Sequence, residues 1–521
     1  MATHDESISG LIHGNYQKWP NRVMVTFETG EQWTWAEAFD IGVSTARTLR
    51  AHGLDGRSHV GVLLENGADW FRAWLGITLL GGTIVPFLTA HRGAVLADML
   101  RRSDCRAIIT SSELRGRLGT PSPGVRVIAA DTLKDRSGRE ADFPGLPDRR
   151  GWDLHALLFT SGTTGPSKAV EVSHHFLLHA SDWWSSPAVG VDIGETDAFL
   201  CDLPLAHMGA LAQCLQMVRL GGRIDVRGRP DLRNYWSVAR ETGSTFSILL
   251  STMAEFLRSQ PPSADEREHR LRAVLGVPVI RDTPEFVARF GINHIVTAFG
   301  STETGIPLLR TAAWDVPERS CGQLLPGVEG RIVDAHDIEL PSNTPGELVL
   351  RRSEPWEQTQ GYYGDDGATR ALMRNGWLHT GDILSVDTDG NFFFHDRGKD
   401  YLRRRGENVS SFEVEREALA HPAVEEAACV GVEDRDGNEE IKIFLVRSPG
   451  RDVVEEQVLE FLAGRMAHFM VPRFYEFVAE LPKTDTGRVK KFELRAHPLS
   501  GATWDRAAAG FTLSRHGLTR P

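Results

Sequence analysis

The pattern of apolar and polar positions from Val23 to about Ala130 alternates between short apolar runs and helical spacing. Residues 60–64 form a strand-like run, residues 70–80 place their apolar side chains on one helical face, and residues 81–87 return to a strand. This alternation is typical of βαβ units, in which helices cover both faces of a sheet. The pattern therefore predicts the α/β class.

The same rhythm resumes after a polar loop and then gives way to other patterns. Strand-like runs recur at residues 156–159, 199–203, 247–250, 273–279 and 294–298. Closely spaced turns with alternating apolar positions at residues 322–396 predict a β-rich subdomain, and residues 412–477 alternate between helical and strand-like runs. We predict a large N-terminal domain (1–396), a small α+β C-terminal domain (397–498) and a flexible tail (499–521).

Length, charge and cysteine content narrow the class of protein. A chain of 521 residues exceeds the roughly 250–300 residues that one core supports, so at least two domains are expected. The net charge of −12 disfavours nucleic acid and anionic membranes as partners. The polar start and the lack of an apolar run near ~20 residues lead us to expect a cytoplasmic protein without membrane insertion. Five scattered cysteines predict buried, reduced thiols and neither a disulfide framework nor a zinc site.

The most informative motif is a loop of hydroxyls, glycines and a lysine that follows an apolar strand. It comprises Thr160, Ser161, Gly162, Thr163, Thr164, Gly165, Pro166, Ser167 and Lys168. Glycines let backbone N–H groups face an anion, and the hydroxyls and the lysine add donors and charge. This predicts a phosphate-binding loop, against the alternative of an ordinary surface loop. Pro166 and Ser167 separate Gly165 from Lys168, which disfavours a Walker A loop.

Four further motifs follow in order along the chain. They are residues 299–303 (Phe-Gly-Ser-Thr-Glu), 377–382 (Trp-Leu-His-Thr-Gly-Asp), 396–400 (Asp-Arg-Gly-Lys-Asp) and 402–410 (Leu-Arg-Arg-Arg-Gly-Glu-Asn-Val-Ser). Taken singly, the first would indicate a helix N-cap, the second a turn aspartate and the last a solvated hairpin. Together the five resemble the adenylate-forming superfamily of acyl- and aryl-CoA ligases, luciferases and peptide-synthetase adenylation domains, over residues 10–495.

The resemblance implies roles for individual residues. Glu303 would bind Mg²⁺, Thr302 and Thr163 would contact phosphate oxygens, and Asp382 would accept hydrogen bonds from the ribose hydroxyls. The ATP-binding residues that it implies are Thr160, Ser161, Gly162, Thr163, Thr164, Gly165, Lys168, Phe299, Gly300, Ser301, Thr302, Asp382 and Arg397. A cation and fixed donors are needed because a carboxylate must attack the anionic α-phosphate of ATP.

The resemblance also implies a mobile C-terminal domain. Lys399 would be the hinge, and the loop of Arg405, Gly406 and Glu407 would enter the site for the second half-reaction, with CoA. The Gly-Glu-Asn form of this loop is closer to acyl- and aryl-CoA ligases, including carnitine-type ligases, than to peptide-synthetase domains. No carrier-protein serine motif follows the C-terminal domain.

Arg488 departs from the family pattern, because it stands where the superfamily has its catalytic lysine. Arginine keeps the charge but differs in shape, so either Arg488 does the lysine's work, or Lys490 or Lys491 does, or the acid is unusual. The catalytic candidates are Arg488, Lys399, Thr302 and His207. His207 is equally well a pocket residue or a structural histidine. The turn at residues 276–278 also departs from the family, and we do not expect a long fatty acyl substrate.

Three functions follow from this sequence. The leading one is ATP- and Mg²⁺-dependent activation of a small-molecule acid as acyl-AMP and its transfer to CoA. The second is adenylation followed by transfer to an amine acceptor. It includes a diazotase of secondary metabolism, which activates nitrite to diazotise an aromatic amine. Arg488 is the reason to retain this alternative. The third is a nucleotide-binding protein that has lost catalysis, against which the intact Thr163, Glu303 and Asp382 argue. The acid, the acceptor and the oligomeric state stay open.

Overall fold

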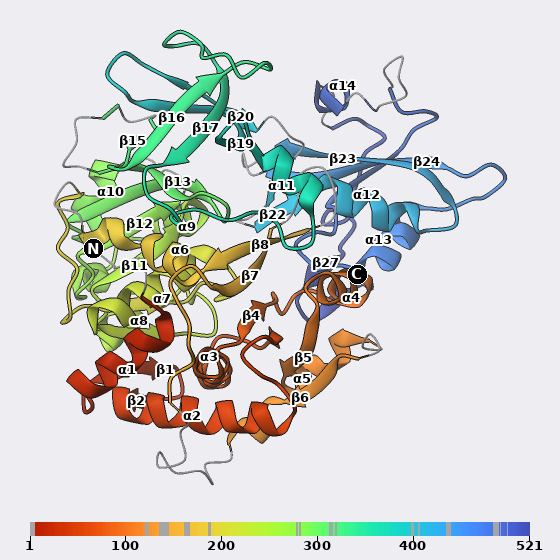
Figure 1. Ribbon diagram of the computed structural model, residues 1–521. Coiled ribbons are helices and arrows are strands. Elements are labelled where there is room, and N and C mark those ends of the chain that lie inside the picture. Colours follow the sequence, from red (N-terminus) through yellow and green to blue (C-terminus); the bar gives the residue numbers. More distant parts are fainter. Residues whose placement is uncertain are drawn as a thin grey trace.

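The computed structural model divides the chain into two regions, each with its own apolar core (Figure 1). It describes residues 6–119, 124–134, 145–160, 167–185, 189–277, 280, 283–311, 316–317, 320–397, 401–404, 407–433, 439–482, 489, 491–496 and 499–520. The main core of the first region reaches Phe392, and that of the second begins at Leu402. The predicted domain boundary at residues 396–397 lies between them.

The first region contains a six-stranded sheet in the order β6-β5-β3-β4-β7-β8. All pairs are parallel except β7 with β8, which form an antiparallel hairpin. The strands are β3 (His59–Leu63), β4 (Thr83–Pro86), β5 (Cys105–Thr110), β6 (Arg126–Ala129), β7 (Leu154–Thr160) and β8 (Lys168–Ser173). The phosphate-loop motif therefore joins two antiparallel strands.

A nine-stranded sheet follows the order β15-β14-β13-β12-β11-β9-β10-β1-β2. Its central strands are parallel, while β2, β14 and β15 are antiparallel to their neighbours. The strands are β1 (Val23–Phe27), β2 (Gln32–Thr34), β9 (Ala198–Cys201), β10 (Arg223–Val226), β11 (Phe246–Leu250), β12 (Ala273–Val277), β13 (His294–Ser301), β14 (Gly305–Arg310) and β15 (Gln323–Leu324).

Helices pack around these two sheets (Figure 1). They are α1 (Ile8–Lys18), α2 (Trp35–Ala51), α3 (Ala68–Leu80), α4 (Gly93–Arg102), α5 (Ser112–Arg115), α6 (His174–His179), α7 (Met208–Leu220), α8 (Tyr235–Thr242), α9 (Ser251–Ser259) and α10 (Thr283–Phe290). Thr34 and Glu37 form a capping box that starts α2. Gly76 lets α3 approach α2, because a Cβ there would lie 2.2 Å from Thr45 Cγ2. Each helix in the described part of the chain is too short or too polar to cross a bilayer.

The predicted β-rich subdomain is a five-stranded antiparallel sheet in the order β16-β17-β19-β18, with β20 beside β19. Its strands are β16 (Val328–Val333), β17 (Gly346–Arg352), β18 (Met373–Arg374), β19 (Trp377–Val386) and β20 (Phe392–Arg397), and α11 (Asp366–Leu372) lies between β17 and β18 in the chain. This sheet stands at the top of Figure 1.

The C-terminal region begins with a hairpin of β21 (Tyr401–Arg404) and β22 (Glu407–Ser410). A sheet follows, made of β23 (Val424–Glu433), β24 (Glu439–Arg447), β25 (Phe474–Phe477) and β26 (Trp504–Asp505), with the helices α12 (Ser411–Leu419), α13 (Glu455–Ala463) and α14 (Lys491–Ala496). The predicted α/β fold, with a large N-terminal and a smaller α+β C-terminal domain, is confirmed. All five cysteines are buried and free of disulfides, as expected.

The chain end differs from the predicted flexible tail. Residues 499–520, here called the C-terminal extension, pack onto the C-terminal domain. β26 pairs with β25, a hairpin forms from β27 (Thr512–Ser514) and β28 (Gly517–Thr519), and Phe511 is buried. The apolar side chains that make these contacts are few, and they do not follow the spacing of a helix or a strand. Periodicity therefore did not reveal these contacts.

Candidate active site

Glu303 lies where three segments distant in sequence converge. Tyr362 Oη donates a hydrogen bond to Glu303 Oε1 at 2.8 Å, and Thr160 Oγ1 donates to the same oxygen at 3.5 Å. Lys168 Nζ lies 4.9 Å from the ring centroid of Tyr362. The predicted metal-binding carboxylate and the two ends of the predicted phosphate loop are therefore neighbours.

The β7–β8 hairpin explains how the phosphate loop is held. Thr160 and Lys168 are paired in register as the last and first residues of the two strands. The predicted residues Ser161, Gly162, Thr163, Thr164 and Gly165 lie outside the described residues. Sequence reasoning did not single out Tyr362, which sits in an irregular segment with no periodic pattern.

The motif at residues 299–303 lies at a turn between antiparallel strands, so the alternative of a helix N-cap is wrong. Ser301 Oγ accepts hydrogen bonds from the backbone N–H groups of Glu303 at 3.2 Å and Thr304 at 3.3 Å, which orders the turn around Thr302. Gly300 occupies an irregularity in the β13–β14 register, where a Cβ would lie 1.9 Å from the carbonyl oxygen of Gly305. This close approach requires glycine.

The donors around Glu303 fit a magnesium ion. Mg²⁺ takes only one or two protein carboxylates and completes its shell with substrate phosphates and water. Glu303 is half-buried, the hydroxyls of Tyr362 and Thr160 donate to it, and Lys168 lies beside Tyr362. Among the described residues there is no group of three or more His, Cys, Asp or Glu side chains that could hold a metal by itself.

Asp382 is a buried carboxylate on β19, so the alternative of a turn residue is wrong. It pairs in register with Arg397 on β20. His379, three residues earlier, instead contacts Glu347 through Nδ1 at 3.0 Å. Phe299 lies 6.2 Å from Phe394 of β20, centroid to centroid. Strands β13, β19 and β20 thus bring the predicted ATP-binding residues Phe299, Asp382 and Arg397 into one region.

The C-terminal hairpin reaches the N-terminal domain at His207. His207 Nε2 lies 3.2 Å from Glu407 Oε2, which joins the predicted second half-reaction loop to the start of α7. The motif at residues 402–410 does form a hairpin, but Arg404 is buried and paired with Glu440 at 2.6 Å rather than solvated. The contact gives His207 a carboxylate partner on the C-terminal domain, and the choice between a pocket residue and a structural histidine stays a prediction. Arg405, Gly406 and the hinge Lys399 lie outside the described residues.

The His207–Glu407 pair is charged. Burial is the largest single influence on each group and opposes its charged form. The Coulombic attraction and the hydrogen bond between the two side chains together outweigh it, so the pKa of His207 is raised and the pKa of Glu407 is lowered. Burial lowers the pKa of His91 and of His468, each to about 4, so both neighbours of Glu407 are neutral near pH 7. His207 is therefore the positive partner of Glu407.

A second contact joins the phosphate hairpin to the C-terminal domain. The backbone N–H of Ser167 donates to Glu413 Oε1 at 2.8 Å, and the Ser167 hydroxyl bonds the same oxygen. Glu413 lies in the first turn of α12. It is buried, and this burial raises its pKa. No periodic signal pointed to this pair.

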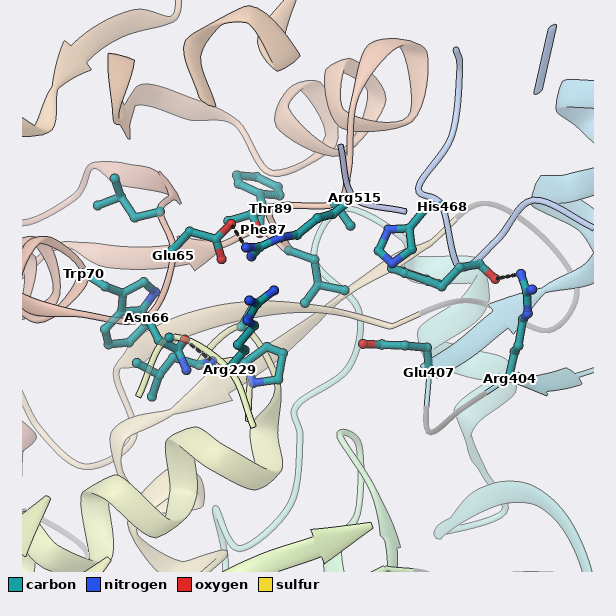
Figure 2. Close-up of a pocket in the computed structure, with 18 of the residues that line it drawn as sticks. Glu65, Asn66, Trp70, Phe87, Thr89, Arg229, Arg404, Glu407, His468 and Arg515 are labelled. Atoms are coloured by element: carbon teal, nitrogen blue, oxygen red, sulfur yellow. Dashed lines mark hydrogen bonds and ion pairs between the residues drawn. The ribbon is translucent and has the colours of Figure 1, made fainter. Parts of the chain in front are cut away.

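A cavity of about 370 Å³ opens between the domains beside Glu407 (Figure 2). We call it the interdomain cavity. It is lined by Leu64, Glu65, Asn66, Trp70, Phe87, Leu88, Thr89, Ala90, Pro204, Leu205, Ala206, Gly228, Arg229, Arg404, Glu407, His468, Phe469, Arg506, Leu513 and Arg515. Asn66 fixes one wall, since its side chain donates to Leu203 O at 2.8 Å and accepts from Leu205 N at 3.1 Å.

The lysine candidates near Arg488 are only partly placed. Arg488 and Lys490 lie outside the described residues. Lys491 Nζ contacts Glu415 Oε1 at 2.7 Å and Ser411 Oγ at 2.8 Å, both within the C-terminal domain. In this arrangement Lys491 serves contacts within its own domain.

The family follows from this fold and motif arrangement together with sequence comparison. The model of the AMP-binding enzyme family matches residues 13–363, and that of the AMP-binding enzyme C-terminal domain matches residues 413–488. The first match alone covers more than half of the chain, which therefore belongs to the AMP-binding enzymes. The predicted membership of the adenylate-forming superfamily, and the prediction of an enzyme, are confirmed.

Individual relatives are similar along most of their length. Crotonobetaine/carnitine–CoA ligase of Citrobacter koseri is 29% identical over 506 residues, covering 91% of this chain and 96% of the relative. The amide bond synthetase of Marinactinospora thermotolerans has a TM-score of 0.77 at 24% identity, covering 94% of this chain and 99% of its own.

One relative has been solved in more than one complex. o-Succinylbenzoate CoA synthetase of Bacillus subtilis, bound with its product analogue, has a TM-score of 0.82 at 23% identity and covers 94% of this chain and 99% of its own. The same protein with its acyl-adenylate intermediate has a TM-score of 0.67 at 23% identity, covering 95% and 99%. The TM-score is therefore higher with the product-analogue complex than with the acyl-adenylate complex.

Proposed function

We propose that this enzyme activates a carboxylic acid with ATP as acyl-AMP and transfers the acyl group to CoA, releasing pyrophosphate and AMP. The observation that carries the proposal is the contact of His207 with Glu407, which lines the interdomain cavity, in a chain of the AMP-binding family. It brings the C-terminal hairpin to the N-terminal site. The names of the carnitine–CoA and succinylbenzoate–CoA relatives agree with this activity.

In the first half-reaction, a carboxylate oxygen attacks the α-phosphorus of ATP and the bond to the pyrophosphate oxygen breaks. We propose that Thr160, Lys168 and Thr302 bind the phosphates and that Asp382 and Arg397 bind the ribose. Glu303, oriented by Tyr362, would hold Mg²⁺, which neutralises phosphate charge when bound. Fixed donors at these oxygens lower the barrier because they need no reorganisation as charge develops. Arg488 is proposed to contact the carboxylate.

In the second half-reaction, the acceptor sulfur forms a bond to the acyl carbon, the bond to the AMP oxygen breaks, and the thiol proton passes to solvent. We propose that the C-terminal domain rotates about Lys399 between the two steps and that Arg405, Gly406 and Glu407 then border the acceptor path. The Glu407–His207 ion pair and the Glu413–Ser167 hydrogen bonds hold that orientation. The higher TM-score with the product-analogue complex supports this assignment.

An amine acceptor is the second candidate, because an amide bond synthetase is among the structural neighbours. The adenylation step would be the same, and the amine nitrogen would replace the thiol sulfur as nucleophile. Activation of nitrite is the special case in which Arg488 serves a small anion instead of a carboxylate.

The test is ATP–pyrophosphate exchange with a panel of aliphatic acids, aromatic acids and nitrite, followed by mass analysis of products formed with CoA or with amines. Acid-dependent exchange and a CoA thioester are expected. An amide without thioester would replace the CoA proposal by the amine acceptor, and exchange driven by nitrite alone would indicate diazotisation. Nucleotide binding with no exchange for any acid would overturn the proposal in favour of a protein that has lost catalysis.

A further inference from the structure

The C-terminal extension lies beyond the matched family domains, which end at residue 488. Several polar contacts anchor it to the C-terminal domain in addition to Phe511. Arg473 forms two hydrogen bonds to the Asp505 carboxylate, each at 3.1 Å, Arg506 Nε donates to Pro472 O at 3.0 Å, and Arg520 pairs with Glu460 at 2.7 Å. The extension therefore moves with the C-terminal domain.

The tip of its hairpin crosses to the N-terminal domain. Arg515 Nη1 lies 3.8 Å from Glu65 Oε1, and Arg117 Nη2 donates to the carbonyl oxygen of Arg515 at 3.5 Å. Leu513 and Arg515 both line the interdomain cavity. Figure 2 shows Arg515 beside Glu65, with Glu407 and His468 farther along the cavity. A wall of this cavity thus comes from a segment outside the family domains.

The arginines that line the cavity differ in burial and in the number of their polar contacts. Arg404 is buried, pairs with Glu440 and donates to two backbone carbonyls, and Arg506 is buried against Pro472. Arg229 is exposed, and the Arg515 side chain is 37% exposed with a partner carboxylate at 3.8 Å that is itself 46% exposed. Such an exposed, long ion pair contributes little and is readily exchanged for another anion. Arg229 and Arg515 are the guanidinium groups best placed to receive a ligand.

We propose that the C-terminal extension determines acceptor specificity, with Arg515 binding a phosphate group of the acceptor during the transfer step. The inference rests on the proposed function, which supplies a phosphorylated thiol as acceptor. A guanidinium matches a phosphate because its planar fork donates two parallel hydrogen bonds. Since the extension moves with the C-terminal domain, Arg515 borders the cavity in the orientation described here and serves transfer rather than adenylation.

The experiment compares three acceptors that share one thiol arm: CoA, 3′-dephospho-CoA and pantetheine. Arg515→Ala should raise the KM for CoA roughly tenfold, the scale of one lost charged hydrogen bond, and the KM for pantetheine much less. If the rise in KM is seen with CoA but not with 3′-dephospho-CoA, Arg515 contacts the 3′-phosphate. If the rise is also seen with 3′-dephospho-CoA, Arg515 contacts the diphosphate. Both outcomes support the proposal. An equal change for CoA and pantetheine, or no change, would overturn it.

Two further variants separate binding from a structural role. Arg520→Ala removes the same charge from the same hairpin but faces Glu460, so the KM for every acceptor should stay that of the parent. Glu65→Gln removes the competing carboxylate and should lower the KM for CoA. If Arg515 only bridged the domains, Glu65→Gln and Arg515→Ala would both impair transfer, contrary to the proposal.

Calorimetric titration with CoA distinguishes failure of this inference from failure of the proposed function. We expect CoA to bind the parent, and to bind Arg515→Ala at least several-fold more weakly. Equal affinities would overturn the role of Arg515 and leave the CoA ligase intact. No binding of CoA to the parent, together with no thioester for any acid, would overturn both.

Discussion

At the residue scale, the carboxylate of Glu303 depends on neighbours from other segments. Tyr362 and Thr160 both donate to one of its oxygens, which orients the group and leaves the other oxygen for a cation. Such a fixed orientation suits the proposed metal role of Glu303, because a site works best when its groups are positioned before the substrate arrives. The charge and its orientation can be tested separately.

Glu303→Gln should reduce pyrophosphate exchange by about 10²-fold or more, because an amide keeps the shape but loses the charge that attracts Mg²⁺. Tyr362→Phe, which removes only the orienting hydrogen bond, should cost on the order of tenfold or less. Exchange rates at several Mg²⁺ concentrations check both. Parent-like exchange by Glu303→Gln would contradict the metal role.

We expect the His207–Glu407 pair to make the proposed transfer step sensitive to pH. The pKa of His207 is raised above its ordinary 6.5, so the ion pair is fully formed below that value and is lost as pH rises through the raised pKa. The transfer rate of the parent divided by that of Glu407→Gln should therefore be largest near pH 6 and fall at alkaline pH. This ratio cancels the ionisation of the acceptor thiol, and a flat ratio would refute the pair's role.

Arg488 decides between an ordinary and an unusual acid. If it replaces the catalytic lysine for a carboxylate, Arg488→Ala should lose about 10²-fold in exchange and Arg488→Lys should retain activity. If its shape serves a small anion such as nitrite, Arg488→Lys should impair turnover of that anion although the charge is unchanged. Exchange assays with each active acid check this, and parent rates in Arg488→Ala would exclude a catalytic role.

At the scale of elements, antiparallel hairpins deliver most of the site. β7–β8 carries the phosphate loop, β13–β14 carries the Glu303 turn, and β21–β22 carries Glu407. A hairpin places two ends of a short segment at a fixed separation, which suits a loop that must bind an anion. The β13–β14 turn depends on Gly300, where the strand backbones approach most closely.

Gly300→Ala should lower the melting temperature by roughly 4 °C or more and strongly reduce pyrophosphate exchange, because its Cβ would overlap the carbonyl oxygen of Gly305 and displace Glu303. Gly209→Ala is the matched control, since a Cβ at this position in α7 meets no other atom within 4 Å. The control should unfold within about 2 °C of the parent. A parent-like Gly300→Ala would refute the steric argument.

At the scale of the whole molecule, the described orientation of the domains rests on polar contacts at separate places. Glu413 meets Ser167, Glu407 meets His207 and Arg515 meets Glu65. Polar interfaces between domains favour relative motion, because water can replace their hydrogen bonds when the domains separate. This fits a C-terminal domain that takes two orientations during the reaction.

Lys399→Pro should restrict φ at the proposed hinge and trap one orientation, so that one half-reaction survives and the other fails. Adenylation is followed by pyrophosphate exchange and transfer by thioester formation from supplied acyl-AMP. Equal loss of both steps would count against a hinge at this position. Lys399→Ala, which leaves φ free, should keep both half-reactions coupled.

Local patterns were enough to predict the fold class and the order of the chemical motifs. Strand and helix periodicity over residues 60–87 reappears as β3, α3 and β4, because alternation of apolar side chains decides which face a short segment buries. Glu303, Asp382 and Glu407 were singled out because the short motifs that contain them resemble those of the adenylate-forming superfamily. These inferences needed no knowledge of contacts distant in sequence.

Only the tertiary structure revealed which distant residues complete the site. Tyr362 meets Glu303, Glu413 meets Ser167 and Arg515 reaches Glu65, and the two residues of these pairs differ in number by 59, 246 and 450 respectively. Such contacts depend on how sheets and domains pack, and no periodicity or short motif encodes them. The C-terminal extension was misjudged for the same reason: its few apolar side chains find their partners on strands and helices formed much earlier in the chain.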